Sequence, residues 1–171
     1  MTAADQARTR VATADDAALI ARLLRDFNAE FDEPVPDQEW LAGRVAELLR
    51  RGDTAVILLD GARSDVPADG LAVLRFRPAL WDEGDECYLA ELYVRPPMRG
   101  LGLGRKLLSA ALRYASDRGA THMDLATTSE DTAAIALYES MGFDRHAQRG
   151  PDTVAYYYEI DLRRLHGSPS R

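Results

Sequence analysis

The sequence predicts an α/β (α+β) fold in which a mixed central sheet of about seven strands carries helices on both faces. Apolar runs of strand length alternate with segments whose apolar residues recur at helical spacing, in the order β-α-α-β-β-β-α-β-α-β-β. Near the middle of the chain, a glycine-rich turn joins a strand directly to a helix. No linker, repeat or low-complexity tract interrupts the 171 residues, so we expect one domain over residues 1–171, with an ordered core at about 9–165.

The first third of the chain predicts a short strand followed by two helices. Residues 9–12 have strand character, and Thr13 and Asp16 have the spacing of a capping box, in which a hydroxyl and a carboxylate satisfy helix-start N–H groups. Apolar residues at helical spacing then predict a helix over 15–28. Two prolines force a loop after it. A second apolar stripe predicts another helix, which ends near residues 51–52.

The middle of the chain predicts three strands and a helix. Residues 54–59 and 70–77 are rich in β-branched and apolar residues and read as an antiparallel hairpin. The central strand, 88–94, ends before two consecutive prolines, because proline has no N–H for a strand ladder. A helix follows from about 105 to 118.

The last third predicts two strands and a helix, and then a final strand. Residues 121–126 and 143–148 read as strands on either side of a helix over 132–141, which Gly142 ends. Residues 154–162 read as the last strand. The helix before residue 121 connects two parallel strands, and such crossovers are right-handed.

Composition excludes several classes of protein. The net charge of −7 disfavours nucleic acid as a partner, since phosphate contacts need clustered Lys and Arg. It suits a cationic small molecule or a basic peptide, although solubility alone can account for it. No apolar run is long enough to span a membrane and the first residues lack a secretory signal, so we expect a cytoplasmic protein. One cysteine and three dispersed histidines predict no metal site.

The turn Arg99-Gly100-Leu101-Gly102-Leu103-Gly104 is the strongest functional signal in the chain. Glycines let backbone N–H groups approach a phosphate closely, and a helix N-terminus favours negative charge. The turn fits neither the dinucleotide fingerprint G-x-G-x-x-G nor the phosphate loop G-x-x-x-x-G-K-[ST]. The alternative to a phosphate-binding turn is a flexible turn before a surface helix, with no ligand.

Two motifs together resemble the GCN5-related N-acetyltransferase (GNAT) family. The first is Arg99-x-x-Gly102-x-Gly104 after an apolar strand, which is similar to the family's acyl-CoA pyrophosphate loop. The second is the helix sequence 131–143, DTAAIALYESMGF, which matches Asn-x-x-Ala-x-x-Leu-Tyr-x-x-x-Gly-Phe at five of six positions. Asp131 replaces the usual Asn. It can still cap a helix, but it cannot donate an amide hydrogen bond.

The resemblance implies a GNAT-like domain that binds acetyl-CoA as cosubstrate, without a metal. Strand 88–94 would splay from strand 121–126, so that pantetheine lies between them like an added strand and the glycine turn holds the pyrophosphate. The resemblance places these residues at the cofactor: Leu92, Tyr93, Val94, Arg99, Gly100, Leu101, Gly102, Leu103, Gly104, Arg105, Asp131 and Ala134.

The resemblance also implies two catalytic residues. Tyr138 would be the general acid, since a phenol with a pKa of about 10 stays protonated at neutral pH and can donate to a leaving thiolate. Without the flanking motif it would read as a core aromatic. Glu91 would be the base that takes the proton of the amine, with a solvent-facing or salt-bridged residue as the alternative. Cys87 has no histidine nearby in the sequence, which disfavours a covalent acyl carrier.

The acceptor is left open by the sequence. Phe31 lies between the first two helices and Trp81 lies in an acidic loop, and aromatic groups beside carboxylates suit an ammonium group. Ordinary solvated acidic surface is the alternative. We expect an acetyl-CoA-dependent N-acetyltransferase that acts on a primary amine of a small molecule or peptide by direct attack on the thioester. The alternative is a non-catalytic acyl-CoA-binding sensor or interaction module of the same fold. A homodimer is common in the family.

Overall fold

The structure is a computed structural model that describes residues 3–60 and 67–146 and the single residues 158, 160 and 162. The chain divides into two compact units, Met1–Leu125 and Ala126–Arg171. The expectation of a single domain with an ordered core at about 9–165 therefore stays a prediction.

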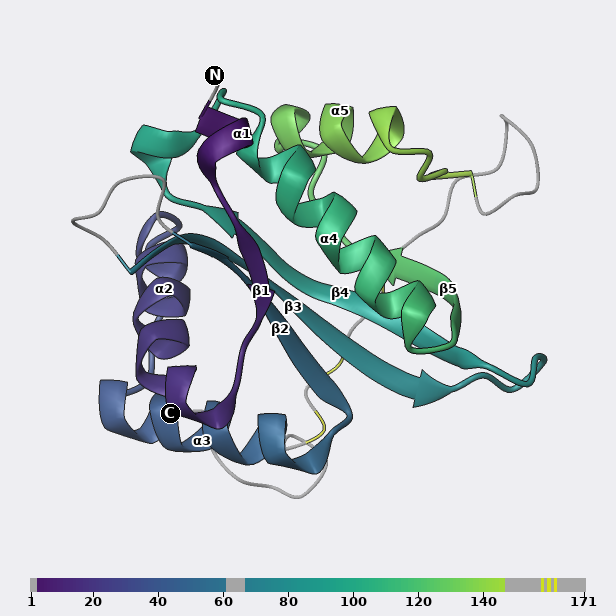
Figure 1. Ribbon diagram of the computed structural model, residues 1–171, viewed down its shortest axis with the longest axis horizontal. Helices are drawn as coiled ribbons and strands as arrows, with labels where there is room; N and C mark the ends of the chain where they lie inside the picture. Colours follow the sequence, from purple (N-terminus) through teal and green to yellow (C-terminus); the bar gives the residue numbers. More distant parts are fainter. Residues whose placement is uncertain (1–2, 61–66, 147–157, 159, 161, 163–171) are drawn as a thin grey trace. The chain divides into compact units, whose positions relative to one another are not determined.

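The first unit contains a mixed five-stranded sheet in the order β1-β2-β3-β4-β5 (Figure 1). All neighbouring strands are antiparallel except β4 and β5, which are parallel. The strands are β1 Thr9–Val11, β2 Thr54–Asp60, β3 Ala68–Pro78, β4 Asp85–Val94 and β5 Ala120–Leu125. The helices are α1 Ala3–Gln6, η1 Ala14–Asp16, α2 Ala17–Ala29, α3 Gln38–Arg51, η2 Pro96–Met98 and α4 Leu103–Asp117. The second unit contains α5, Thr132–Ser140.

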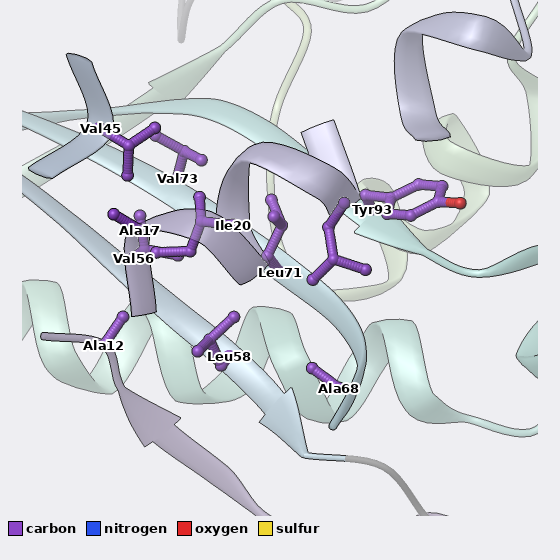
Figure 2. Packing of buried hydrophobic residues seen from close by; sticks show 11 residues of the cluster. Ala12, Ala17, Ile20, Val45, Val56, Leu58, Ala68, Leu71, Val73 and Tyr93 are labelled. Carbon is purple, nitrogen blue, oxygen red and sulfur yellow. The ribbon is translucent and has the colours of Figure 1, made fainter. Parts of the chain in front are cut away.

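Helices cover both faces of the sheet, as predicted. Figure 2 shows one face, where Ile20 of α2 and Val45 of α3 pack with Val56 and Leu71 of the sheet. Side chains alternate across a strand, so the neighbouring residues of β2 and β3 face the other side, where α4 buries an apolar stripe. That stripe consists of Leu103, Leu107, Leu108, Ala111 and Ala115.

The prediction of about seven strands is not confirmed, because the described residues form five. Residues 143–146, predicted as the start of a strand, form a turn and irregular backbone. The His146 N–H donates to the Asp144 carboxylate at 2.8 Å, and this local bond turns the backbone instead of extending it. The rest of that predicted strand lies outside the described residues. So does the strand predicted at 154–162, apart from three single residues that are not in a strand.

Two helix starts differ from expectation. The polar N-terminus, which precedes the expected ordered core at about 9–165, contains α1 because Lys106 donates from Nζ to the Ala4 carbonyl at 2.5 Å and Ala7 is buried. Helix α4 begins at Leu103, two residues before the predicted start. Leu103 is 1% exposed, so burial of its side chain carries the helix into the glycine turn.

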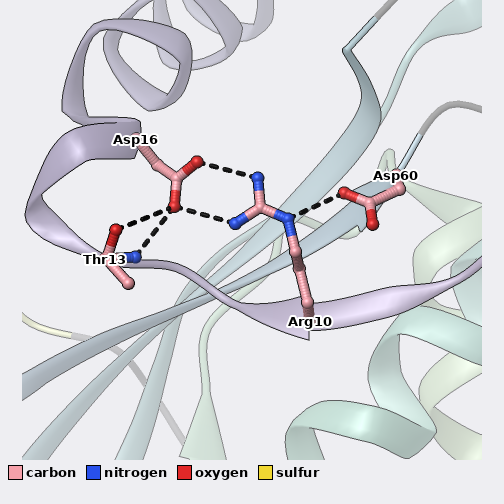
Figure 3. Close-up of polar contacts among 4 residues, drawn as sticks. All are labelled: Arg10, Thr13, Asp16 and Asp60. Atoms are coloured by element: carbon pink, nitrogen blue, oxygen red, sulfur yellow. Dashed lines mark hydrogen bonds and ion pairs between the residues drawn. The ribbon is translucent and has the colours of Figure 1, made fainter.

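An arginine ties β1 to its neighbours (Figure 3). Arg10 donates from Nη1 and Nη2 to the two oxygens of Asp16 at 2.8 and 2.7 Å, and from Nε to Asp60 at 3.0 Å. The same Asp16 carboxylate accepts the Thr13 N–H at 2.8 Å, which is the predicted capping contact. The hydrogen bonds from Arg10 lower the pKa of Asp16 to about 2. Asp16 therefore closes the capping box before α2 and also anchors the edge strand β1.

We expect Asp16→Asn to lower the free energy of unfolding at pH 7 by about 1–2 kcal/mol, the order of one helix cap plus one partly exposed ion pair. Because the folded pKa of Asp16 is depressed, its contribution is present above pH about 4 and is lost as the pH falls toward 2. Urea unfolding at pH 7 and pH 2.5 measures the difference. Glu47→Gln, which removes an exposed i,i+3 pair with Arg44, should leave the unfolding midpoint nearly unchanged. A loss for Asp16→Asn that persists undiminished at pH 2.5 would contradict the assignment.

Candidate active site

Strand β4 has one free edge over its last five residues. Its parallel pairing with β5 ends at Leu89 opposite Leu125, whereas β4 continues to Val94. Among the described residues, no strand pairs with Ala90–Val94 on that side. On the other side the same segment pairs with β3 up to Gly70 opposite Val94. Because β5 itself ends at Leu125, the expected splaying of the two strands beyond this pair stays a prediction.

The backbone of Leu92 and Val94 points to the free edge. The Arg95 N–H donates to the Asp69 carbonyl of β3 at 2.9 Å, so this residue directs its backbone toward β3. Backbone groups alternate along an antiparallel strand, and the preceding even-numbered residues therefore face away from β3. The Val94 carbonyl accepts a hydrogen bond from Arg99, not from β3, which agrees with this direction.

A β-bulge lies just before this segment. The register of β3 and β4 shifts between the pair Val73–Glu91 and the pair Leu74–Leu89, which leaves Ala90 as the extra residue. A bulge bends its strand and strengthens the local twist, and it commonly re-aims side chains beside a functional site. The sequence contains no clear signal for it, since alternation in 88–94 is already blurred by apolar residues on both faces.

Glu91 follows the bulge and lies on the face of the sheet that α2 covers. It pairs with Val73, whose side chain belongs to the core on that face. Burial raises the pKa of the Glu91 carboxyl above its ordinary value, and the charge of Arg75 opposes the rise. A carboxylate with a raised pKa is a better proton acceptor near neutral pH.

The glycine turn leads from this edge to the start of α4. Met98 is buried and anchors the short helix η2, and Gly100 and Gly102 then adopt left-handed φ values of 75° and 78°. Gly102 is the N-cap of α4, and its carbonyl accepts the first helical hydrogen bond, from Lys106 N–H. The N–H groups of the first turn of a helix have no partner within the helix, and such groups are able to bind an anion.

Arg99 is held by three groups. Its Nε donates to the Val94 carbonyl at 2.8 Å, and its Nη2 contacts both oxygens of Glu30 at 3.0 and 2.8 Å. Its guanidinium carbon lies 5.8 Å from the centre of the Tyr93 ring. Glu30 was not predicted as a site residue. It precedes Arg99 by 69 residues, and nothing in the local sequence marks the pair.

An aromatic series connects this site to the end of α2. Phe27 lies 5.1 Å from Tyr93 and 5.4 Å from Phe31, measured between ring centres. Tyr93 is 3% exposed, and Figure 2 shows its hydroxyl directed away from the apolar cluster. Burial and the Glu30 carboxylate, with which the phenol forms a hydrogen bond, raise the pKa of Tyr93 to about 12. Tyr93 therefore stays protonated and links β4 to α2.

The two predicted acceptor residues are not brought together. Phe31 lies at the Tyr93 end of β4, within the aromatic series, and is 60% exposed. Trp81 is 92% exposed and precedes the first residue of β4, Asp85. At 3.3 Å per residue, Trp81 lies about 20 Å or more from Leu92 along the strand.

The second unit holds the remaining predicted site residues. Asp131 is the N-cap of α5, and its carboxylate accepts the Ala134 N–H at 3.1 Å, so its expected capping role is confirmed. Tyr138 is half-buried on α5 and meets Phe143 edge-on, with ring centres 5.8 Å apart.

Other candidate chemistry is not supported by the geometry. Cys87 is fully buried, and burial raises the pKa of its thiol to about 11, so it is a poor nucleophile. The described part of the chain has no group of three or more His, Cys, Asp or Glu side chains placed to hold a metal ion. None of the helices that the structure describes is long and apolar enough to cross a membrane.

Comparison with known proteins connects this geometry to a family. Residues 20–143 match the model of the Acetyltransferase (GNAT) family. The chain is 33% identical over 130 residues to a mycothiol acetyltransferase of Rhodococcus erythropolis, which covers 73% of this chain and 43% of that protein. It is 30% identical over 136 residues to the uncharacterized N-acetyltransferase YjgM of Escherichia coli, covering 77% and 78% of the two chains. The chain thus spans less than half the length of the mycothiol acetyltransferases that it matches.

A solved structure extends the similarity to the backbone. A protein of Arthrobacter sp. FB24, whose name places it among acetyltransferases, aligns with a TM-score of 0.80 at 41% identity. The alignment covers 90% of this chain and 95% of that one. A metagenomic aminoglycoside acetyltransferase in complex with sisomicin aligns with a TM-score of 0.71 at 18% identity, covering 92% and 98%, and shares the fold.

We expect Glu91→Gln to raise the thermal unfolding midpoint at pH 8 by about 2–4 °C. The folded pKa of Glu91 is raised, so its neutral form is favoured in the fold and stability is lost as the pH rises through that value. Calorimetry should therefore find the gain at pH 8 and little difference near pH 4. Glu83→Gln, at an exposed loop position, is the control and should change neither midpoint. An unchanged or lower midpoint for Glu91→Gln at pH 8 would argue against a partly buried carboxylate with a raised pKa.

Proposed function

Because the chain belongs to the acetyltransferase (GNAT) family, we propose that it transfers an acetyl group from acetyl-CoA to a primary amine of a small molecule or peptide. The observation that carries the proposal is the edge of β4 that pairs with no described strand and leads through η2 into the glycine turn and the N-terminus of α4. An extended ligand with amide groups and a diphosphate matches both features.

The cofactor has a defined set of partners in this proposal. Leu92 and Val94 bind pantetheine through backbone groups on the free edge, with Tyr93 between them packed against α2. The diphosphate binds to N–H groups of residues 99–104, and Arg99 and Arg105 contribute positive charge. In the second unit, Asp131 and Ala134 at the start of α5 hold the pantetheine arm. Acetyl-CoA supplies an electrophilic thioester carbonyl when it is bound.

Each chemical step is assigned to a residue of this chain. The Leu92 N–H donates to the thioester oxygen and stabilises the negative charge that develops there during attack. Glu91 accepts the proton of the attacking amine at its carboxylate, directly or through water, which its raised pKa favours. Tyr138 donates its phenolic proton to the departing thiolate.

The acceptor is proposed to be a small amine that carries positive charge. Phe31 is exposed beside the carboxylates of residues 30, 32 and 33, and an aromatic face with carboxylates attracts ammonium groups. The name of a bovine relative, thialysine N-epsilon-acetyltransferase, specifies a nitrogen of an amino acid side chain as acceptor; it is 27% identical over 141 residues. Trp81 lies at the opposite end of β4 from Phe31, so it contacts the acceptor only if the acceptor is long enough to reach it.

The direct test is acetylation of an amine panel, with release of free thiol as the readout. The panel contains amino acids, polyamines, aminoglycosides and short peptides with a free N-terminus. We expect turnover with one of these classes, and faster turnover with cationic members. Binding of acetyl-CoA without turnover on any amine would favour the non-catalytic sensor, and absence of acetyl-CoA binding would overturn the proposal.

We expect Tyr138→Phe to lower kcat by ~10²-fold, because it removes the proton donor for the thiolate. The ring contact with Phe143 is kept, so binding of acetyl-CoA should be unchanged. Steady-state kinetics and calorimetric titration separate the two effects. Tyr114→Phe on α4 removes a comparable hydroxyl from an aromatic pair with Phe76 and should leave kcat near the wild-type value. An unaltered kcat in Tyr138→Phe would show that the general acid is another group.

A further inference from the structure

The ion pair between Glu30 and Arg99 connects two walls of the proposed site. Glu30 is the residue after α2, and Arg99 is the first residue of the glycine turn. Both Glu30 oxygens lie within 3.0 Å of the same Arg99 nitrogen, Nη2. The pair therefore joins the segment that carries Phe31 to the loop that leads into α4.

The negative charge of Glu30 neutralises the positive charge of Arg99 at the position where a diphosphate is expected. The guanidinium is directed at the Val94 carbonyl and at Glu30, and it lies against the Tyr93 ring. An anion that approaches the turn must compete with a carboxylate already paired with Arg99, one of the two predicted cationic side chains. The affinity of the turn for an anion consequently depends on a residue outside the turn.

The pair is open to such competition. The Arg99 side chain is 48% exposed and that of Glu30 is 25% exposed, and ion pairs at this degree of exposure contribute little to stability. A diphosphate offers more negative charge than one carboxylate and can accept two parallel hydrogen bonds from a guanidinium. The N–H groups at the start of α4 reinforce its hold in the same place.

We propose that Glu30 is a resident counter-ion of Arg99, which the cofactor diphosphate displaces, and that Glu30 thereby sets the affinity for the cofactor. The inference rests on the proposed use of acetyl-CoA. Displacement frees the end of α2 from the turn, so occupation of the cofactor site is transmitted to the segment beside Phe31. Glu30 is a positioning residue in this scheme, because it acts through Arg99.

A double-mutant cycle tests the proposal, with calorimetric titration of coenzyme A into the wild type, Glu30→Gln, Arg99→Gln and the double variant. Removal of the competing carboxylate should tighten binding by about 3- to 10-fold where Arg99 is present. In the Arg99→Gln background the same change should alter binding by less than about 2-fold, because Glu30 acts through Arg99. Equal effects in the two backgrounds, or weaker binding by Glu30→Gln alone, would overturn it.

Two controls separate this mechanism from a general field effect. Asp26→Asn removes a carboxylate one turn earlier on α2, whose charge also acts on Tyr93 but which does not bind Arg99 in the structure. It should change coenzyme A affinity by less than 2-fold, whereas a tightening equal to that of Glu30→Gln would overturn the proposal. Pantetheine lacks the diphosphate, so Glu30→Gln should leave its binding unchanged, and tighter pantetheine binding would overturn the proposal too.

The cycle also distinguishes this inference from the proposed function. If the wild-type protein fails to bind coenzyme A, both the proposed function and the role of Glu30 are overturned. If the wild-type protein binds coenzyme A and acetylates an amine, but the Glu30 and Arg99 substitutions have additive effects on coenzyme A affinity, only the role of Glu30 is overturned. The proposed function then stands.

Discussion

The early end of the pairing between β4 and β5 is the constraint on which the candidate site depends. The pairing stops at Leu89, where β5 itself ends, directly before the bulge at Ala90, and β4 continues for five residues with no described strand on that edge. Free strand edges present N–H and C=O groups that need a partner, and proteins usually cover or blunt them. Here the edge leads through two prolines and a short helix to the start of α4. One continuous segment therefore offers backbone hydrogen bonds along its edge and an anion site at its end.

The charges of the first unit serve different purposes at the two ends of α2. At its start, Asp16 is paired with Arg10, caps the helix and has a lowered pKa, so the charge is stabilising. At its end, Glu30 is paired with an arginine beside the proposed cofactor loop and is more open to exchange. Glu91 differs from both, because burial raises its pKa and its charged form is disfavoured. Such a carboxylate costs stability, and a cost of this kind is common at catalytic sites.

Much of the architecture was predictable because it depends on local rules. Apolar periodicity located the described strands and the three longer helices of the first unit. Glycine marked helix ends, at Gly52 after α3 and, in the second unit, at Gly142 after α5, and both adopt left-handed φ. The failures have local and tertiary causes. Helix α1 and the early start of α4 depend on burial against other parts of the chain, which residue type alone does not reveal. Residues 143–146 have strand-like character but turn, because an aspartate bonds to the backbone two residues on.

The sequence by itself determined the family, the glycine turn after an apolar strand, and the Asp131 cap of the helix that carries Tyr138, since these are contiguous motifs with fixed spacing. Only the tertiary structure decided the direction of the Leu92 and Val94 backbone, the bulge before Glu91 and the pair of Glu30 with Arg99. Strand register and contacts across 69 residues depend on how separate elements pack, and no local pattern encodes them. The same reason separates Phe31 from Trp81: both have suitable chemistry in the sequence, but the length of β4 places them at opposite ends.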